Sequence, residues 1–106
     1  MNPTLGEIRI FAGNFAPQGW AFCNGGLLSI SEYEALFMIV GTTYGGDGET
    51  TFALPDLRGR APVHMGSSLM LGQTAMPAAA DGQKPSPSWL GLNFIIALQG
   101  NFPTPS

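Results

Sequence analysis

The chain has 106 residues, of which 44% are apolar and 10% are charged, and its formal net charge is −3. The length suits one domain spanning residues 1–106, and the charged fraction lies far below the roughly 25% of an ordinary soluble domain. Four cationic residues are too few for a groove that tracks nucleic-acid phosphates, and no apolar run approaches the ~18 residues of a membrane span.

Low charge has a consequence for the surface of the folded chain. Too few charges are available to cover it, so we expect neighbouring copies to cover part of it, in a homo-oligomer such as a trimer or a filament. The N-terminus lacks the charged start and long apolar run of a cleavable signal peptide. We therefore expect synthesis in the cytoplasm and a place in a virion, a tail-like particle or another extracellular assembly.

Short apolar runs separated by glycine and proline predict a mainly β (α+β) fold. Residues 6–12 alternate, with Ile8, Ile10 and Ala12 on one face and Glu7 and Arg9 on the other, which predicts a half-buried strand. Residues 20–24 form a second predicted strand. Asn24-Gly25 is typical of a type I′ hairpin, which would lead into a third strand at 27–30.

One short helix is predicted over 31–40, packed on the sheet. Ser31 and Glu34 match a capping box at its start, and apolar residues recur at helical spacing after them. Gly41 follows as a natural stop.

The second half of the chain alternates between turns and short strands. Strands are predicted at 52–54 and 92–98, and the continuous apolar character of the last one suggests burial on both faces. Residues 61–65 form an edge strand at best because Pro62 cannot donate to a ladder. Residues 67–88 lack periodicity and are interpreted as a shortened, flexible surface segment. The predicted core consists of Phe11, Trp20, Phe37, Tyr44, Phe52, Leu54, Leu57, Phe94 and Ile96.

No combination of residues points to catalysis, a cofactor or a metal. His64 has no partner at motif spacing, and Asp47-Gly48-Glu49 lacks the alternating oxygen ligands of a calcium loop. Cys23 is the only cysteine, so it cannot form an internal disulfide. We interpret it as a buried thiol in a strand, with an intermolecular disulfide as the alternative. The prediction is a protein that is not an enzyme.

Asp56, Arg58 and Arg60 form the most charged short stretch of the chain. These residues could contact a ligand such as a sugar. The interpretation we favour is structural, in which the guanidinium groups bind the Asp56 carboxylate and loop carbonyls.

Two phrases resemble the phage tail collar domain, a family that also includes bacterial microcystin-dependent protein homologues. The first is GEIRIFAG followed by PQGWAFCNG, in 6–25. The second begins at 35 and ends in TFALPDLRGR at 51–60, and residues 92–100 are similar to the C-terminal strand of those homologues. The resemblance implies a small β domain with a structural role in tails, tail-like particles or fibres, and oligomers that are commonly trimeric.

The chain departs from the family pattern at two places. Family members usually carry a longer segment with a Pro-x-His-x-His phrase where this chain has 67–88, which contains no histidine. A metal held by such histidines is therefore not expected here. Asn24 stands where the family usually has Asp.

The leading hypothesis is a self-assembling structural protein of a fibre, tail tip or filament, with other tail or baseplate proteins as possible partners. Strand addition at an exposed edge or at the terminal strand would join the copies. The predicted assembly residues are Trp89, Phe94, Ile95, Ile96 and Leu98. The alternative is a tip module that binds a receptor or a cell-surface glycan through loop 42–51, the Asp56, Arg58 and Arg60 cluster, and Trp89.

Overall fold

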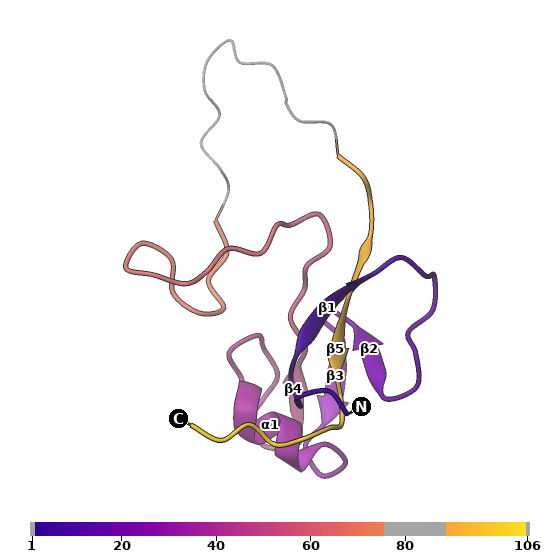
Figure 1. Cartoon of the computed structure of the whole chain (residues 1–106). Helices are drawn as coiled ribbons and strands as arrows, with labels where there is room; N and C mark the ends of the chain where they lie inside the picture. Colours follow the sequence, from indigo (N-terminus) through magenta and orange to yellow (C-terminus); the bar gives the residue numbers. More distant parts are fainter. Residues whose placement is uncertain (1, 76–88, 106) are drawn as a thin grey trace.

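The computed structural model describes residues 2–75 and 89–105, which form two small sheets and one short helix (Figure 1). The elements follow in the order β1 (Ile8–Phe11), β2 (Trp20–Phe22), β3 (Leu27–Ser29), α1 (Glu34–Val40), β4 (Thr51–Ala53) and β5 (Asn93–Ala97). The predicted mainly β class with one short helix is confirmed. No helix in the described part of the chain is long and apolar enough to cross a membrane.

The larger sheet has the antiparallel order β1-β5-β2, so the last strand lies between the first two (Figure 1). Ile10 pairs with Phe94 in the register of β1 with β5, and Ala21 pairs with Ile96 in that of β2 with β5. The central strand β5 is paired along both of its edges. Ile95, Ile96 and Ala97 are all buried, as the continuous apolar run predicts.

The Asn24-Gly25 hairpin prediction is wrong. β2 pairs with β5 whereas β3 pairs with β4, so β2 and β3 belong to different sheets. A type I′ turn needs positive φ at both central residues, and no described residue other than glycine has positive φ. Asn24 Oδ1 instead accepts the backbone N–H of Gly26 at 3.1 Å, and the chain crosses from one sheet to the other here.

The helix begins later than its sequence predicts. Its N-cap is Tyr33, without a side-chain cap, so the capping box at Ser31 is wrong. The backbone N–H of Tyr33 bonds to the carbonyls of Ser29 and Ile30, which closes a turn before the helix starts, and the Ser31 hydroxyl lies 2.9 Å from that of Ser29. The predicted stop at Gly41 is confirmed, since α1 ends at the preceding residue.

A small core lies between the larger sheet, α1 and the β3–β4 pair. Its buried cluster consists of Leu5, Cys23, Leu36, Phe52, Leu54 and Ile96. Phe52 is fully buried, and its ring lies 5.4 Å from that of Phe37 at a tilted angle. Burial of a side chain of this size contributes about 1.5–3 kcal/mol.

The predicted core is confirmed at its centre and only half-buried around it. Phe52, Leu54 and Ile96 are buried. The half-buried members are Phe11, Trp20, Phe37, Tyr44, Leu57 and Phe94.

The prediction of a half-buried strand at β1 is wrong for Ile8 and Ile10. These side chains are 41% and 64% exposed, because β1 is an edge strand and the core cluster includes neither of them. Residues 61–65 are exposed and form no strand. In the predicted surface segment 67–88, almost all of the described residues are exposed, while 76–88 lie outside the described residues.

Candidate functional site

The Asp56 turn is held in place by backbone bonds to the end of β2. Leu57 donates its N–H to the carbonyl of Cys23 at 2.9 Å, and Gly25 donates to the carbonyl of Pro55 at 3.2 Å. Asn24 and Asp56 form an isolated antiparallel bridge. These bonds fix the turn against the chain that links the two sheets.

Within this turn, the side chains of Arg58 and Asp56 form an ion pair with each other. The guanidinium Nε and Nη2 of Arg58 donate to Oδ1 and Oδ2 of Asp56 at 2.9 and 2.8 Å, and the Arg58 backbone N–H adds a third bond at 3.1 Å. The Arg58 side chain lowers the pKa of the Asp56 carboxyl well below its ordinary value, and this pairing raises the pKa of Arg58. Arg60 Nη1 donates to the Asp56 carbonyl at 2.9 Å. The geometry is that of the structural interpretation, and contact with a ligand stays a prediction.

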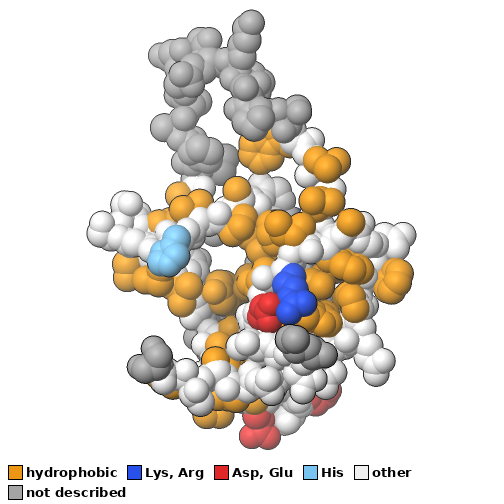
Figure 2. All heavy atoms as spheres, viewed as in Figure 1, with side chains coloured by type: hydrophobic (Ala, Val, Ile, Leu, Met, Phe, Trp, Pro, Cys, Tyr) orange, Lys and Arg blue, Asp and Glu red, His pale blue; other side chains and the backbone are white. Residues whose placement is uncertain are grey.

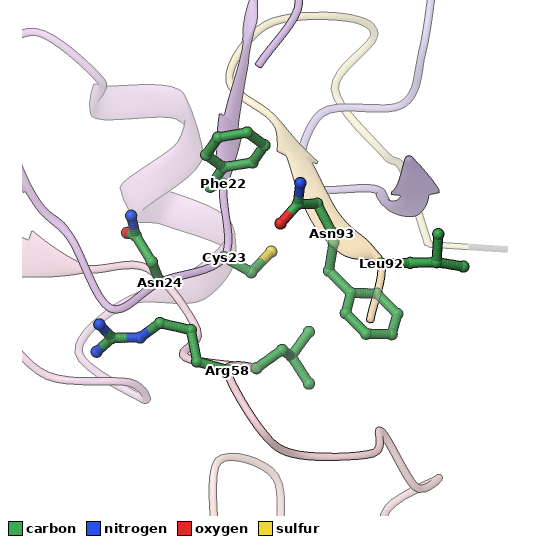
Figure 3. Close-up of a pocket in the computed structure, with 8 residues that line it drawn as sticks. Phe22, Cys23, Asn24, Arg58, Leu92 and Asn93 are labelled. Atoms are coloured by element: carbon green, nitrogen blue, oxygen red, sulfur yellow. The ribbon is translucent and has the colours of Figure 1, made fainter. Parts of the chain in front are cut away.

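A shallow cavity of about 220 Å³ adjoins the turn (Figure 3). It is lined by Phe22, Cys23, Asn24, Leu57, Arg58, Leu92, Asn93 and Phe94. Burial raises the pKa of the Cys23 thiol to about 11, so the thiol is neutral near pH 7 and a poor nucleophile. The mostly apolar lining suits an apolar group better than acid–base chemistry.

Other candidate chemical groups lie apart from this cavity. His64 is exposed, and its Nδ1 lies 2.8 Å from the backbone carbonyl of Met65. The described residues contain no group of three or more His, Cys, Asp or Glu side chains arranged to hold a metal ion.

The five predicted assembly residues have very different exposures. Ile95 and Ile96 are buried within the chain, Phe94 and Leu98 are half-buried, and Trp89 is 79% exposed. Both edges of β5 are already paired, by β1 and β2. An assembly role for this strand stays a prediction, and among these five residues it would depend most on Trp89.

Sequence reasoning missed an apolar surface beside this strand. By register and alternation, Ile8, Ile10 and Phe94 share one face of the larger sheet, and Leu92 directly precedes β5; these four residues are here called the inner-face strip. The same face continues into the core at buried Ile96, which pairs with Ile8. All members of the strip except the half-buried Phe94 count among the exposed apolar residues. Figure 2 shows broad apolar areas with few charged side chains between them. The alternation in β1 was the available signal, but it was interpreted as that of a half-buried strand.

The described residues form a small β-rich domain with two small antiparallel sheets and one short helix. The charged groups of its Asp56 turn are hydrogen-bonded to each other within the chain. The family model of the phage tail collar domain matches residues 6–62, more than half of the chain. The chain therefore belongs to the phage tail collar domain family and is a phage tail fibre-type structural protein. A comparison with curated proteins found no match.

Proposed function

We propose that the protein is a non-catalytic subunit that self-associates in a phage tail fibre, tail tip or tail-like filament, and that the inner-face strip contacts neighbouring copies. The observation that carries this proposal is the exposure of large apolar side chains in a chain with 10% charged residues. Exposed apolar patches of this kind mark interaction surfaces in soluble proteins.

The charges of β1 are placed so that they leave the inner-face strip free. Arg9 alternates with Ile8 and Ile10 and therefore points to the other face of the sheet. Its Nε donates to Glu7 Oε2 at 2.6 Å, and its guanidinium carbon lies 5.2 Å from the Trp20 ring centre. A charge on the strip would oppose burial of the strip against a second copy. The alternation of β1 keeps the Arg9 charge on the other face of the sheet.

The outer edge of β1 offers a second means of contact. Within the described residues, β1 is paired on one side only. Edge strands of this kind can accept a strand from another chain. Association along β1 would bury Ile8 and Ile10 and satisfy backbone groups at the same time, in a trimer or a longer filament.

Substitution on the strip tests this proposal. Ile10→Glu places a charge in the proposed contact, so we expect it to lower the average mass seen by sedimentation velocity. Met38→Glu is the matched control, because Met38 is 75% exposed on α1 and lies outside the strip. Equal masses for both variants and the unmodified chain would contradict a role of the strip in association.

A second candidate function is recognition of a receptor or glycan by a fibre tip. The observation that favours it is Trp89, which is 79% exposed and lies a few residues before β5. Exposed tryptophans are common anchors in binding surfaces. Trp89→Ala should reduce binding to host cells or glycans, whereas unchanged binding would remove Trp89 from that role.

A further inference from the structure

Three distant segments meet at Trp20 and line an open cavity of about 340 Å³ next to β2 and the end of β5. Its lining consists of Asn2, Pro3, Gln18, Gly19, Trp20, Gln99 and Gly100. The volume falls at the lower end of the roughly 300–1,000 Å³ of small-molecule sites.

Backbone bonds hold these segments in fixed positions. Asn101 donates its N–H to the Pro3 carbonyl at 2.9 Å, and Leu98 donates to the Gly19 carbonyl at 2.8 Å. Trp20 itself pairs with Ala97 in the sheet. The cavity is thus formed by backbone that the fold already orders, which lowers the entropic cost of binding a ligand.

A charged pair lies next to the Trp20 ring. Arg9 lies over the ring and is bonded to Glu7, which also accepts the backbone N–H of Thr4 at 3.0 Å. The Glu7 carboxylate therefore neutralises the Arg9 charge near the cavity. Among the described residues, no charged side chain lines the cavity itself.

The lining favours one class of ligand. Asn2, Gln18 and Gln99 each carry a primary amide that can donate and accept, and none of them bonds to another described side chain or backbone group. An apolar ligand would leave these amides without partners, which is unfavourable. An anion would find no cationic side chain among the described lining residues. A ligand with neighbouring neutral hydroxyl groups would satisfy the amides and pack its C–H surface against the indole.

We propose that this cavity is a binding site for a neutral saccharide, with Trp20 as the apolar contact and Gln18 and Gln99 as the hydrogen-bonding groups. The proposal deepens the recognition function given above as the second candidate, on which it rests, and places the sugar at Trp20 rather than at Trp89 or the Asp56 turn. It does not depend on self-association.

Two-dimensional NMR of the full chain tests the site. The two tryptophans give separate indole N–H signals, and the probes are neutral hexoses and N-acetylhexosamines at millimolar concentration. We expect a saturable shift of the Trp20 signal with at least one sugar. Gln18 and Gln99 are both exposed. A double variant that carries Gln18→Ala and Gln99→Ala should bind the sugar roughly tenfold or more weakly, because each substitution removes hydrogen bonds to the ligand.

Gln73→Ala, which removes an exposed glutamine outside the cavity lining, is the matched control and should leave the Trp20 titration unchanged. The proposal is overturned if no sugar shifts the Trp20 signal, if the double glutamine variant binds as well as the unmodified chain, or if only the Trp89 signal moves. If only the Trp89 signal moves, the protein binds a sugar but not at Trp20. Failure of the Trp20 site is then distinguishable from failure of the recognition function.

Discussion

Asp47 is the residue that shapes the loop between α1 and β4. Its Oδ1 accepts the backbone N–H groups of Glu49, Thr50 and Thr51 at 2.8–2.9 Å, and its Oδ2 accepts the Thr50 hydroxyl at 2.9 Å. These bonds, led by those from the Thr51 and Thr50 backbone, hold the pKa of the carboxyl well below its ordinary value of 3.8. The Asp-Gly-Glu phrase is thus a structural turn held by one side chain.

We expect thermal stability to fall in acid, partly because of Asp47. Its pKa is lower in the folded chain, so its stabilising contribution is present above the unfolded pKa near 3.8 and is lost as pH falls through the folded value. Asp47→Asn keeps an acceptor oxygen but cannot titrate. Its melting temperature should therefore vary less between about pH 7 and about pH 2. An identical pH profile in the variant would contradict this role.

Cys23 should be unreactive in the folded protein. The residue is 4% exposed, and burial raises the pKa of its thiol to about 11. Because the thiolate is the reactive form, iodoacetamide should label the native chain far more slowly than the chain in denaturant. Mass spectrometry reads out the result directly at the single cysteine. Equal rates in both conditions would mean an accessible thiol and would favour the intermolecular disulfide.

At the scale of elements, the loop before β4 depends on the absence of a side chain at Gly46. Its φ is 95°, and an added Cβ would overlap the Phe52 Cα and lie 2.7 Å from the Thr51 carbonyl oxygen. The neighbouring Gly45 carbonyl accepts the N–H of Ala53 at 3.0 Å. The glycine run therefore lets the loop lie directly along β4.

Two alanine substitutions separate steric overlap from backbone strain. Gly59 has a φ of 67° with open space around it, so Gly59→Ala should lower the free energy of unfolding by about 1–2 kcal/mol from strain alone. Gly46→Ala should cost a further ~1–3 kcal/mol because the backbone of β4 must move. Urea unfolding measures both. Equal losses would show that the overlap is relieved without effect on stability.

Strand positions were largely predictable from sequence, while strand pairing was not. Alternation and turn residues place all five strands within a few residues of their observed bounds. The partner of β2, however, is β5, more than seventy residues later, and local turn chemistry at Asn24 carries no information about it. The start of α1 also escaped prediction, because a turn closed by the Tyr33 backbone replaced the expected cap.

The candidate sites, like the strands, were predictable where their residues are close in sequence and not where they are distant. The mutual bonding of Asp56 and Arg58 was anticipated, since they stand two residues apart and carry opposite charges. The cavity at Trp20 could not be anticipated, because it joins residues from both ends of the chain through pairing with β5. The inner-face strip was visible as a pattern, but its exposure depends on where along this face the core that buries Ile96 ends.

At the scale of the whole molecule, the region matched by the family model ends before the last strand of the fold. The match covers residues 6–62, whereas the larger sheet is completed by β5 at Asn93–Ala97. The central strand thus comes from outside the matched region, and the strip next to it combines residues from both. We expect this surface to determine how copies of the chain meet.

The mass of the unmodified protein in solution tests the proposed self-association most directly. One chain has a mass of 11.1 kDa. Light scattering coupled to size-exclusion chromatography, repeated over a dilution series, should give a mass that is a multiple of this value, either a discrete trimer or a larger species that grows with concentration. A mass of one chain at every concentration would contradict the proposal.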